Sequence, residues 1–214
     1  MRNTLPHNRV QKHYLSNFQR EDKMAKIVMI VGDFNEDLEV RFPQQALEML
    51  GHEVHTISPG KPAGSRVVTA VHDLADTSLQ SYTEARGHDF PVSHDFSSLE
   101  PTAYDALVVP GGRAPEYQRC DAHVLKLVRH FFEANKPVAC TCHGIQILAA
   151  AGVLQGRRVT AVPFCRPEVE MADGQWVDRG LDGIEEDGML VTASTWMSNP
   201  DWMRAFGKLL PEDV

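Results

Sequence analysis

The chain has 214 residues, with 21 Lys and Arg against 29 Asp and Glu, a formal net charge of −8, and 43% hydrophobic residues. This length and apolar fraction suit one α/β domain with a substantial core, and the acidic balance argues against a nucleic-acid partner. No run approaches the roughly 18 apolar residues of a membrane span. The four cysteines are too few for a disulfide scaffold, so we expect a reducing, cytoplasmic compartment in which each cysteine serves packing or chemistry.

The first 23 residues differ from the rest of the chain. Basic residues outnumber acidic ones there, the apolar residues show no sustained period, and the apolar stretch of a secretory signal is missing. We therefore expect residues 1–23 to be an N-terminal extension and residues 24–214 to form a single domain. The composition leaves open whether the extension is native, a tag or a targeting segment.

From Lys26 onward, short β-branched runs alternate with segments of helical period. Strands are predicted at residues 27–31, 54–57, 106–109, 137–141, 159–161, 175–177 and 189–193. Helices are predicted at residues 39–50, 122–134, 142–151 and 200–210. Residues 61–99 are polar and irregular, which predicts inserted short strands or a subdomain, and Asp187-Gly188 predicts a hairpin turn. The alternation predicts a doubly wound, mainly parallel sheet with helices on both faces.

Three predicted strands are followed by segments rich in reactive or small residues, namely 32–39, 111–116 and 142–144. In open α/β sheets the ligand site lies beyond the carboxyl ends of the strands. Because parallel strands bring all three segments to the same edge, they are expected to converge on one site.

Cys142 is the strongest candidate for a catalytic residue. It stands between a strand and a helix with small neighbours, which is the layout of a nucleophile elbow. The amides and dipole of the helix N-terminus favour the thiolate and are expected to lower the pKa of the thiol into the reactive range. The alternative is a buried structural cysteine, the role predicted for Cys140 inside the strand. Cys120 and Cys165 are isolated in the sequence, and no set of four ligands is completed, so a metal site is not expected.

Two further side chains could move protons at this site. His143 could act as a base, although adjacent residues at a helix start do not normally face each other; orienting the elbow is the alternative. Glu39 at the entry of the first helix would have a raised pKa if it were desolvated beside the thiol, whereas its commoner role is a surface charge on the helix dipole. Glu36 is a competitor for this role, and Asp37 is the natural helix cap.

Gly111 and Gly112 follow a buried strand, and their backbone amides could stabilise an oxyanion. A Gly-Gly pair is also a common turn, so the signal is weak by itself. No dinucleotide or nucleoside-triphosphate fingerprint occurs.

Together these residues resemble the DJ-1/PfpI (ThiJ/PfpI) superfamily. The resemblance covers residues 24–210 and rests on the motifs EDLE at 36–39, YDALVVPGGRAPE at 104–116 and KPVACTCHG at 136–144, extended by AAGVLQGR at 150–157 and WMR at 202–204. The insert with HD at 72–73 and RGH at 86–88 looks most like the plant DJ-1-like branch with glyoxalase activity.

The resemblance implies a flavodoxin-like fold related to class I glutamine amidotransferases, a homodimer or higher homo-oligomer, a catalytic Cys142 and Glu39 as its carboxyl partner. It places Arg113 beside Gly111 and Gly112 on the substrate side, and it implies that Glu116 approaches the cysteine of a neighbouring subunit. Thr141 departs from the family pattern, in which an aliphatic residue is common before the cysteine, and could change hydration of the elbow.

The favoured function is a cofactor-free glyoxalase or deglycase that converts 2-oxoaldehydes such as methylglyoxal to 2-hydroxy acids. Cys142 would be the nucleophile, with Glu39 and His143 transferring protons. Two alternatives stay open: an intracellular cysteine peptidase of the PfpI type with Cys142, His143 and Glu116, and a redox sensor or holdase based on Cys142. The sequence implies a small aldehyde as the partner and neither nucleic acid nor membrane.

Overall fold

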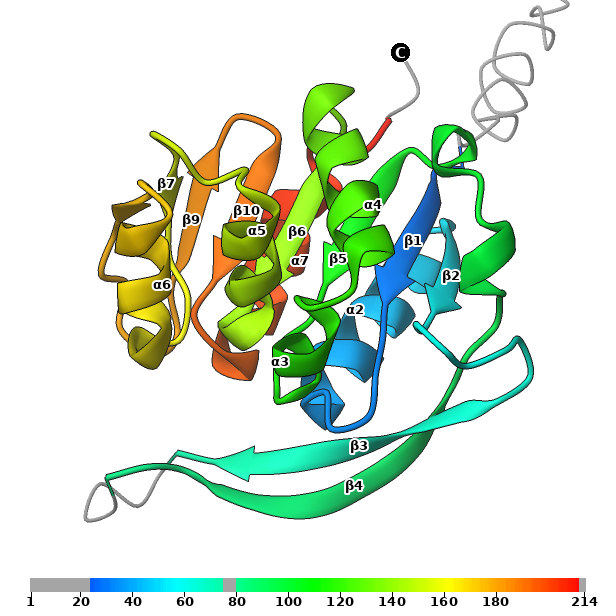
Figure 1. The fold of residues 1–214 in the computed structure, drawn as a ribbon, viewed down its shortest axis with the longest axis horizontal. Helices are drawn as coiled ribbons and strands as arrows, with labels where there is room; N and C mark the ends of the chain where they lie inside the picture. The colour runs from blue at the N-terminus through cyan, green and yellow to red at the C-terminus, as the bar shows by residue number, and fades with distance from the viewer. Residues whose placement is uncertain (1–23, 75–79, 212–214) are drawn as a thin grey trace, which may run out of the picture.

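The computed structural model describes residues 24–74 and 80–211, so the expectation for residues 1–23 lies outside the described residues. The central sheet has six strands in the order β2-β1-β5-β6-β10-β9 (Figure 1). Their bounds are β1 (Lys26–Ile30), β2 (Glu53–Ile57), β5 (Ala106–Val109), β6 (Val138–Thr141), β9 (Ile184–Asp187) and β10 (Leu190–Ala193). Only the pairing of β9 with β10 is antiparallel among these six strands. The prediction of a mainly parallel α/β sheet is confirmed.

Helices cover both faces of this sheet. The helices are α2 (Asp37–Met49), α3 (Ala114–Gln118), α4 (Ala122–Glu133), α5 (Ile145–Ala151), α6 (Arg166–Met171) and α7 (Asn199–Gly207). Helices α4 and α5 pack on one face, and α2 and α7 pack on the other (Figure 1). In α4 the buried residues recur at helical spacing (Val124, Leu127, Val128 and Phe131), and Asp121 caps the helix with its side chain. Each face of the sheet thus has its own apolar core.

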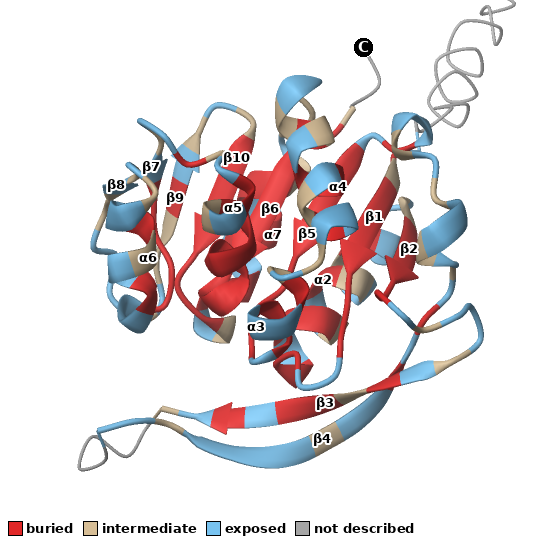
Figure 2. Ribbon diagram, in the orientation of Figure 1, coloured by how far each residue is buried: buried red, intermediate tan, exposed pale blue. Residues whose placement is uncertain are grey.

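The predicted insert is a long two-stranded hairpin of β3 (Arg66–Asp73) and β4 (Thr83–Pro91). It runs along the edge of the body at which the central parallel strands end (Figure 1). Buried and exposed residues intermix along β3, whereas β4 is largely exposed (Figure 2). A second small sheet, β7 (Arg158–Val159) with β8 (Gln175–Trp176), occupies two of the predicted strand positions.

The loop after β1 fixes the hairpin to the body. The Phe34 amide donates to the Val68 carbonyl at 2.6 Å, and the Ala70 amide donates to the Asn35 carbonyl at 2.8 Å. The Asp33 carboxylate accepts from the Val68 amide at 2.9 Å. These bonds hold β3 across the carboxyl edge of the sheet. The hairpin therefore borders the edge at which ligand sites form in open α/β sheets.

None of the helices within residues 24–74 and 80–211 is both long enough and apolar enough to cross a membrane.

Candidate active site

Cys142 occupies a sharp turn at the end of β6. Its φ is 55°, in the left-handed region that side chains other than glycine rarely adopt. Gly144 makes the turn possible, because a Cβ there would lie 2.6 Å from the Val109 carbonyl oxygen and 2.9 Å from that of Pro110. Such strain persists only where the surrounding structure enforces it, and it is concentrated at functional sites. The strand–turn–helix geometry therefore agrees with a nucleophile elbow.

Thr141, the departure from the family pattern, does not place a free hydroxyl beside the thiol. Its Oγ1 donates to the carbonyl of Ala193 on β10 at 3.4 Å, and the residue is buried. The hydroxyl therefore finds its partner on the neighbouring strand.

His143 contacts Cys142 despite being adjacent to it. The unusual turn brings the Cys142 Sγ within 3.3 Å of the His143 Nδ1. Burial, and secondarily the charge of His72, lowers the pKa of His143 to about 4. The imidazole is therefore neutral around pH 7 and can accept or relay the thiol proton.

Glu39 is fully buried under this turn and is not a surface charge. Its Oε2 accepts from the Gly111 amide at 2.9 Å, and its Oε1 makes no hydrogen bond of good geometry. Burial raises the pKa of Glu39 well above its ordinary value, the charge of Glu36 raises it further, and hydrogen bonds with Gly111 and Cys142 oppose the shift. Glu39 is thus a weaker acid than an ordinary exposed carboxyl.

Glu36, rather than Asp37, caps helix α2. Its Oε2 accepts from the Glu39 amide at 2.9 Å, so the expectation that Asp37 is the cap is wrong. Asp37 instead accepts hydrogen bonds from Thr69 and His88 of the hairpin. Burial opposes ionisation of Asp37, but these bonds lower its pKa overall. Burial also raises the pKa of Glu36 to about 7, so two neighbouring carboxyls compete for protons beneath the site.

The pKa of Cys142 differs from the sequence expectation. Burial raises it well above its ordinary value and a charge on Glu39 adds to the increase, whereas the amides of Gly112 and His143 lower it. The contribution from Glu39 disappears when that carboxyl is protonated. A protonated Glu39 therefore opposes the thiolate less than a charged Glu39 does, and the two groups behave as a coupled pair.

The two glycine amides have different partners. The Gly111 amide is bound to Glu39, whereas the Gly112 amide faces the sulfur of Cys142 together with the His143 amide. This differs from the expectation that both glycine amides face the reacting oxygen. Gly111 is needed for space: a Cβ there would lie 2.5 Å from the Cys142 Cβ and 2.6 Å from the Glu39 Oε2.

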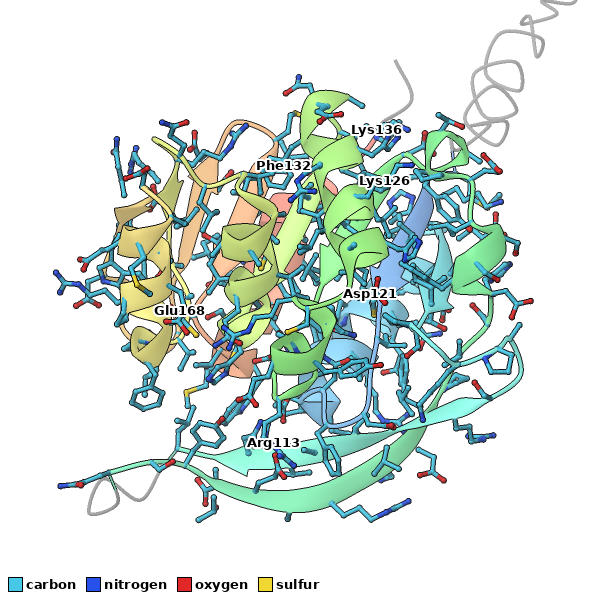
Figure 3. The ribbon with its side chains drawn as sticks, viewed as in Figure 1. Arg113, Asp121, Lys126, Phe132, Lys136 and Glu168 are labelled. Carbon is cyan, nitrogen blue, oxygen red and sulfur yellow. The ribbon has the colours of Figure 1, made fainter. Side chains whose placement is uncertain are left out.

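Arg113 and Glu116 lie on the outer side of the site. Arg113 sits between α3 and the hairpin (Figure 3) and binds Glu84 of β4 through two hydrogen bonds of 2.7 Å. Its guanidinium also lies over the ring of Phe34, 4.6 Å from the centroid. Arg113 is thus committed to holding the hairpin. Glu116 is exposed and lines a cavity of about 630 Å³ with Arg113 and Asp33, and its approach to a neighbouring subunit stays a prediction.

Two residues near Cys142 were not found from the sequence. His72 on β3 is buried and bonds Glu84 at 2.9 Å. The ring of Tyr82 lies 5.7 Å from that of His143 and 4.9 Å from that of His72. His72 was noted only as part of the insert, and neither residue was predicted as a site residue, because both reach the site only through the path of the hairpin.

The remaining cysteines separate by burial. Cys140 and Cys165 are buried and Cys120 is exposed, and all are free thiols. Within the described part of the chain, no group of three or more His, Cys, Asp or Glu residues is placed to hold a metal ion.

Comparison with known proteins decides the family. A sequence model described as DJ-1/PfpI family matches residues 25–209. The chain belongs to the DJ-1/PfpI family. Among curated relatives, Protein DJ-1 homolog D of Arabidopsis thaliana is 44% identical over 186 residues, which cover 86% of this chain and 47% of the relative. The chain therefore spans about half the length of that plant relative.

Single-length relatives and solved structures agree with this assignment. Deglycase TK1284 of Thermococcus kodakarensis is 36% identical over 86% of this chain and 99% of its own length. Protein/nucleic acid deglycase 2 of Escherichia coli is 32% identical over 86% of this chain and 94% of its own length. The crystal structure of Drosophila melanogaster DJ-1beta superposes with a TM-score of 0.71 at 17% identity, covering 87% of this chain and 91% of that one, which shows the shared flavodoxin-like fold. Relatives with deglycase names indicate that the family contains enzymes.

Proposed function

We propose that the protein is a cofactor-free glyoxalase or deglycase that acts on 2-oxoaldehydes or their adducts through Cys142. The observation that carries the proposal is the buried group of Cys142, His143 and Glu39, in which a thiol lies 3.3 Å from a neutral imidazole and beside a carboxyl of raised pKa. The deglycase names of single-length relatives support the same chemistry.

The first step is addition of the thiol to the aldehyde. The Cys142 Sγ bonds to the aldehyde carbon, and the thiol proton passes through His143 to the aldehyde oxygen, which gives a hemithioacetal. The amides of Gly112 and His143 face the sulfur and can donate to the oxygen as its negative charge develops.

The second step moves a hydrogen between the two carbons. The carboxylate form of Glu39 removes the proton from the former aldehyde carbon, giving an enediolate. The protonated carboxyl then returns the proton to the neighbouring carbon, while the hydroxyl proton on the former aldehyde carbon passes to the oxygen of that neighbour. Because the pKa of Glu39 is raised, its carboxylate is a stronger base than an ordinary one. The product is a thioester of the hydroxy acid, and water hydrolyses it to the free 2-hydroxy acid and the thiol.

The test measures hydroxy-acid formation from methylglyoxal and glyoxal without glutathione, and release of amine or thiol from preformed aldehyde adducts of acetylated amino acids. Cys142→Ala and Glu39→Gln are expected to lose at least about a hundredfold in rate. Cys120→Ala is the matched control, because Cys120 is exposed and free, and it should keep the wild-type rate. Full turnover by Cys142→Ala would exclude the mechanism.

The peptidase alternative takes Glu116 from a second copy of the chain. Glu116 is exposed on α3, where a neighbouring subunit could meet it. The alternative predicts peptide hydrolysis that appears with oligomer formation and is lost in Glu116→Gln. Hydrolysis by a monomer, measured at matched size-exclusion peaks, would exclude it.

A further inference from the structure

The β3–β4 hairpin carries an aromatic side chain to the Cys142 site. Tyr82, immediately before β4, has its ring centroid 5.7 Å from that of His143, with an interplanar angle of 58°. On its other sides the ring meets His72 edge-on at 4.9 Å and Phe164 in a stacked arrangement at 6.3 Å. Tyr82 is thus packed among three rings, one of which belongs to the residue that contacts the Cys142 sulfur.

The position of Tyr82 is fixed by a chain of polar contacts. Glu84, two residues further along, accepts from both Arg113 nitrogens at 2.7 Å and binds the His72 Nε2 at 2.9 Å. The backbone amide of His72 in turn donates to the Glu36 carboxyl. These contacts tie both hairpin strands to the loops that follow β1 and β5, so Tyr82 is held on elements that also position the site.

The phenol of Tyr82 is available as a hydrogen-bond donor. Its hydroxyl makes no hydrogen bond to another group within residues 24–74 and 80–211, and the side chain is half-buried. Burial, followed by the negative charge of Cys142 when ionised, raises the pKa of Tyr82 to about 12. The hydroxyl therefore keeps its proton across the working range of pH.

We propose that Tyr82 is a substrate-contacting residue of the Cys142 site. Its ring limits the space beside the thiol, and its hydroxyl donates a hydrogen bond to the second oxygen of a 2-oxoaldehyde bound at Cys142. The part that concerns the second oxygen rests on the proposed function. In that geometry the amides of Gly112 and His143 serve the aldehyde oxygen, and Tyr82 polarises the adjacent carbonyl toward the enediol.

Two variants separate the hydroxyl from the ring. Tyr82→Phe keeps the ring and is expected to lower kcat/KM for methylglyoxal by about tenfold or more, since removing one donor to a developing oxyanion costs up to about 10²–10³ in kcat. Tyr117→Phe is the matched control, because Tyr117 is an exposed tyrosine on α3, and it should leave kcat/KM unchanged. A wild-type value of kcat/KM in Tyr82→Phe would refute the proposal that the Tyr82 hydroxyl donates a hydrogen bond to the substrate.

A second measurement does not depend on turnover. Cys142 is alkylated with small iodoacetamide and with bulky N-phenylmaleimide, and mass spectrometry gives the rate at Cys142 for each reagent. The wild type is expected to prefer the small reagent, and Tyr82→Ala should reduce that preference at least about fivefold, while the unfolding midpoint is recorded to confirm folding. An unchanged preference in folded Tyr82→Ala would refute the proposal that the Tyr82 ring limits the space beside the thiol. If the wild type turned over no oxoaldehyde, the proposed function would fail, and the alkylation ratio would still decide the role of Tyr82.

Discussion

Replacing Glu36 with Gln tests the buried carboxyl pair beneath Cys142. Glu36 is 1% exposed, and its pKa is raised from 4.5 to about 7 by burial. Gln keeps an oxygen that can accept from the Glu39 amide, so the cap of α2 is retained, while the titration is removed. The variant therefore isolates the effect of ionising this carboxyl in the folded protein.

The sign follows from proton linkage. The folded protein binds the Glu36 proton more tightly than the unfolded chain does, so the contribution of Glu36 to the free energy of unfolding is largest below pH 4.5 and is lost as pH rises through about 7. Each pKa unit corresponds to about 1.4 kcal/mol, which gives a total loss of up to about 3 kcal/mol, of which about 2–3 kcal/mol falls between pH 5 and pH 8. Because the charge of Glu36 also raises the pKa of Glu39, removing that charge should bring the pKa of Glu39 closer to its ordinary value.

The assay is urea denaturation of wild type and Glu36→Gln at pH 5, 6, 7 and 8. The stability of Glu36→Gln relative to wild type should rise by about 2–3 kcal/mol across this range, or by about 5–10 °C in Tm for a domain of this size. Glu48→Gln is the matched control, because Glu48 is exposed on the same helix, and its difference from wild type should stay constant with pH. A Glu36→Gln difference that is equally constant would refute the reasoning.

Two further substitutions test packing and charge. Gly111→Ala places a Cβ 2.5 Å from the Cβ of Cys142, so we expect about 1–3 kcal/mol of destabilisation in urea and a loss of at least about a hundredfold in turnover. Gly207→Ala is the control, because its new Cβ meets its nearest atom at 3.8 Å, and it should show neither effect. Equal behaviour of the two variants would contradict the packing argument. The buried carboxylate of Glu185 binds Arg158 at 2.5 Å and Arg179 at 2.6 Å. Each single Arg→Ala change should cost about 1 kcal/mol or less, whereas the double variant should cost about 3–5 kcal/mol because an unpaired buried charge remains; additive free energies of unfolding would refute this.

The order of strands and helices could be predicted because each signal is local. β-branched runs such as residues 27–31 mark strands buried on both faces, and the recurrence of Val124, Leu127, Val128 and Phe131 marks the buried face of α4. The hairpin could be predicted only as an irregular insert. Residues 83–91 are polar and largely exposed, so β4 is held by pairing with β3 and not by a hydrophobic pattern of its own.

The helix cap shows how long-range contacts override a local preference. Asp is a better cap than Glu in general, but Asp37 is occupied by Thr69 and His88 of the hairpin. Glu36 takes the cap instead and becomes buried. The sequence marks the acidic segment, but which acid caps the helix depends on where residues more than 30 positions away are placed.

The pKa of the Cys142 thiol likewise depends on contacts that the local sequence does not reveal, and it bears on function. The helix N-terminus at Cys142 was expected to lower the pKa, and two amides do so, but burial and Glu39 act in the opposite direction and are larger. Oxidation requires the thiolate and access to the oxidant, whereas Cys142 is 4% exposed and burial raises the pKa of its thiol well above the ordinary value. In the function proposed above, the aldehyde oxygen accepts the thiol proton through His143, so the thiolate need not be populated beforehand. A buried thiol with a raised pKa fits that proposal better than it fits an oxidation sensor.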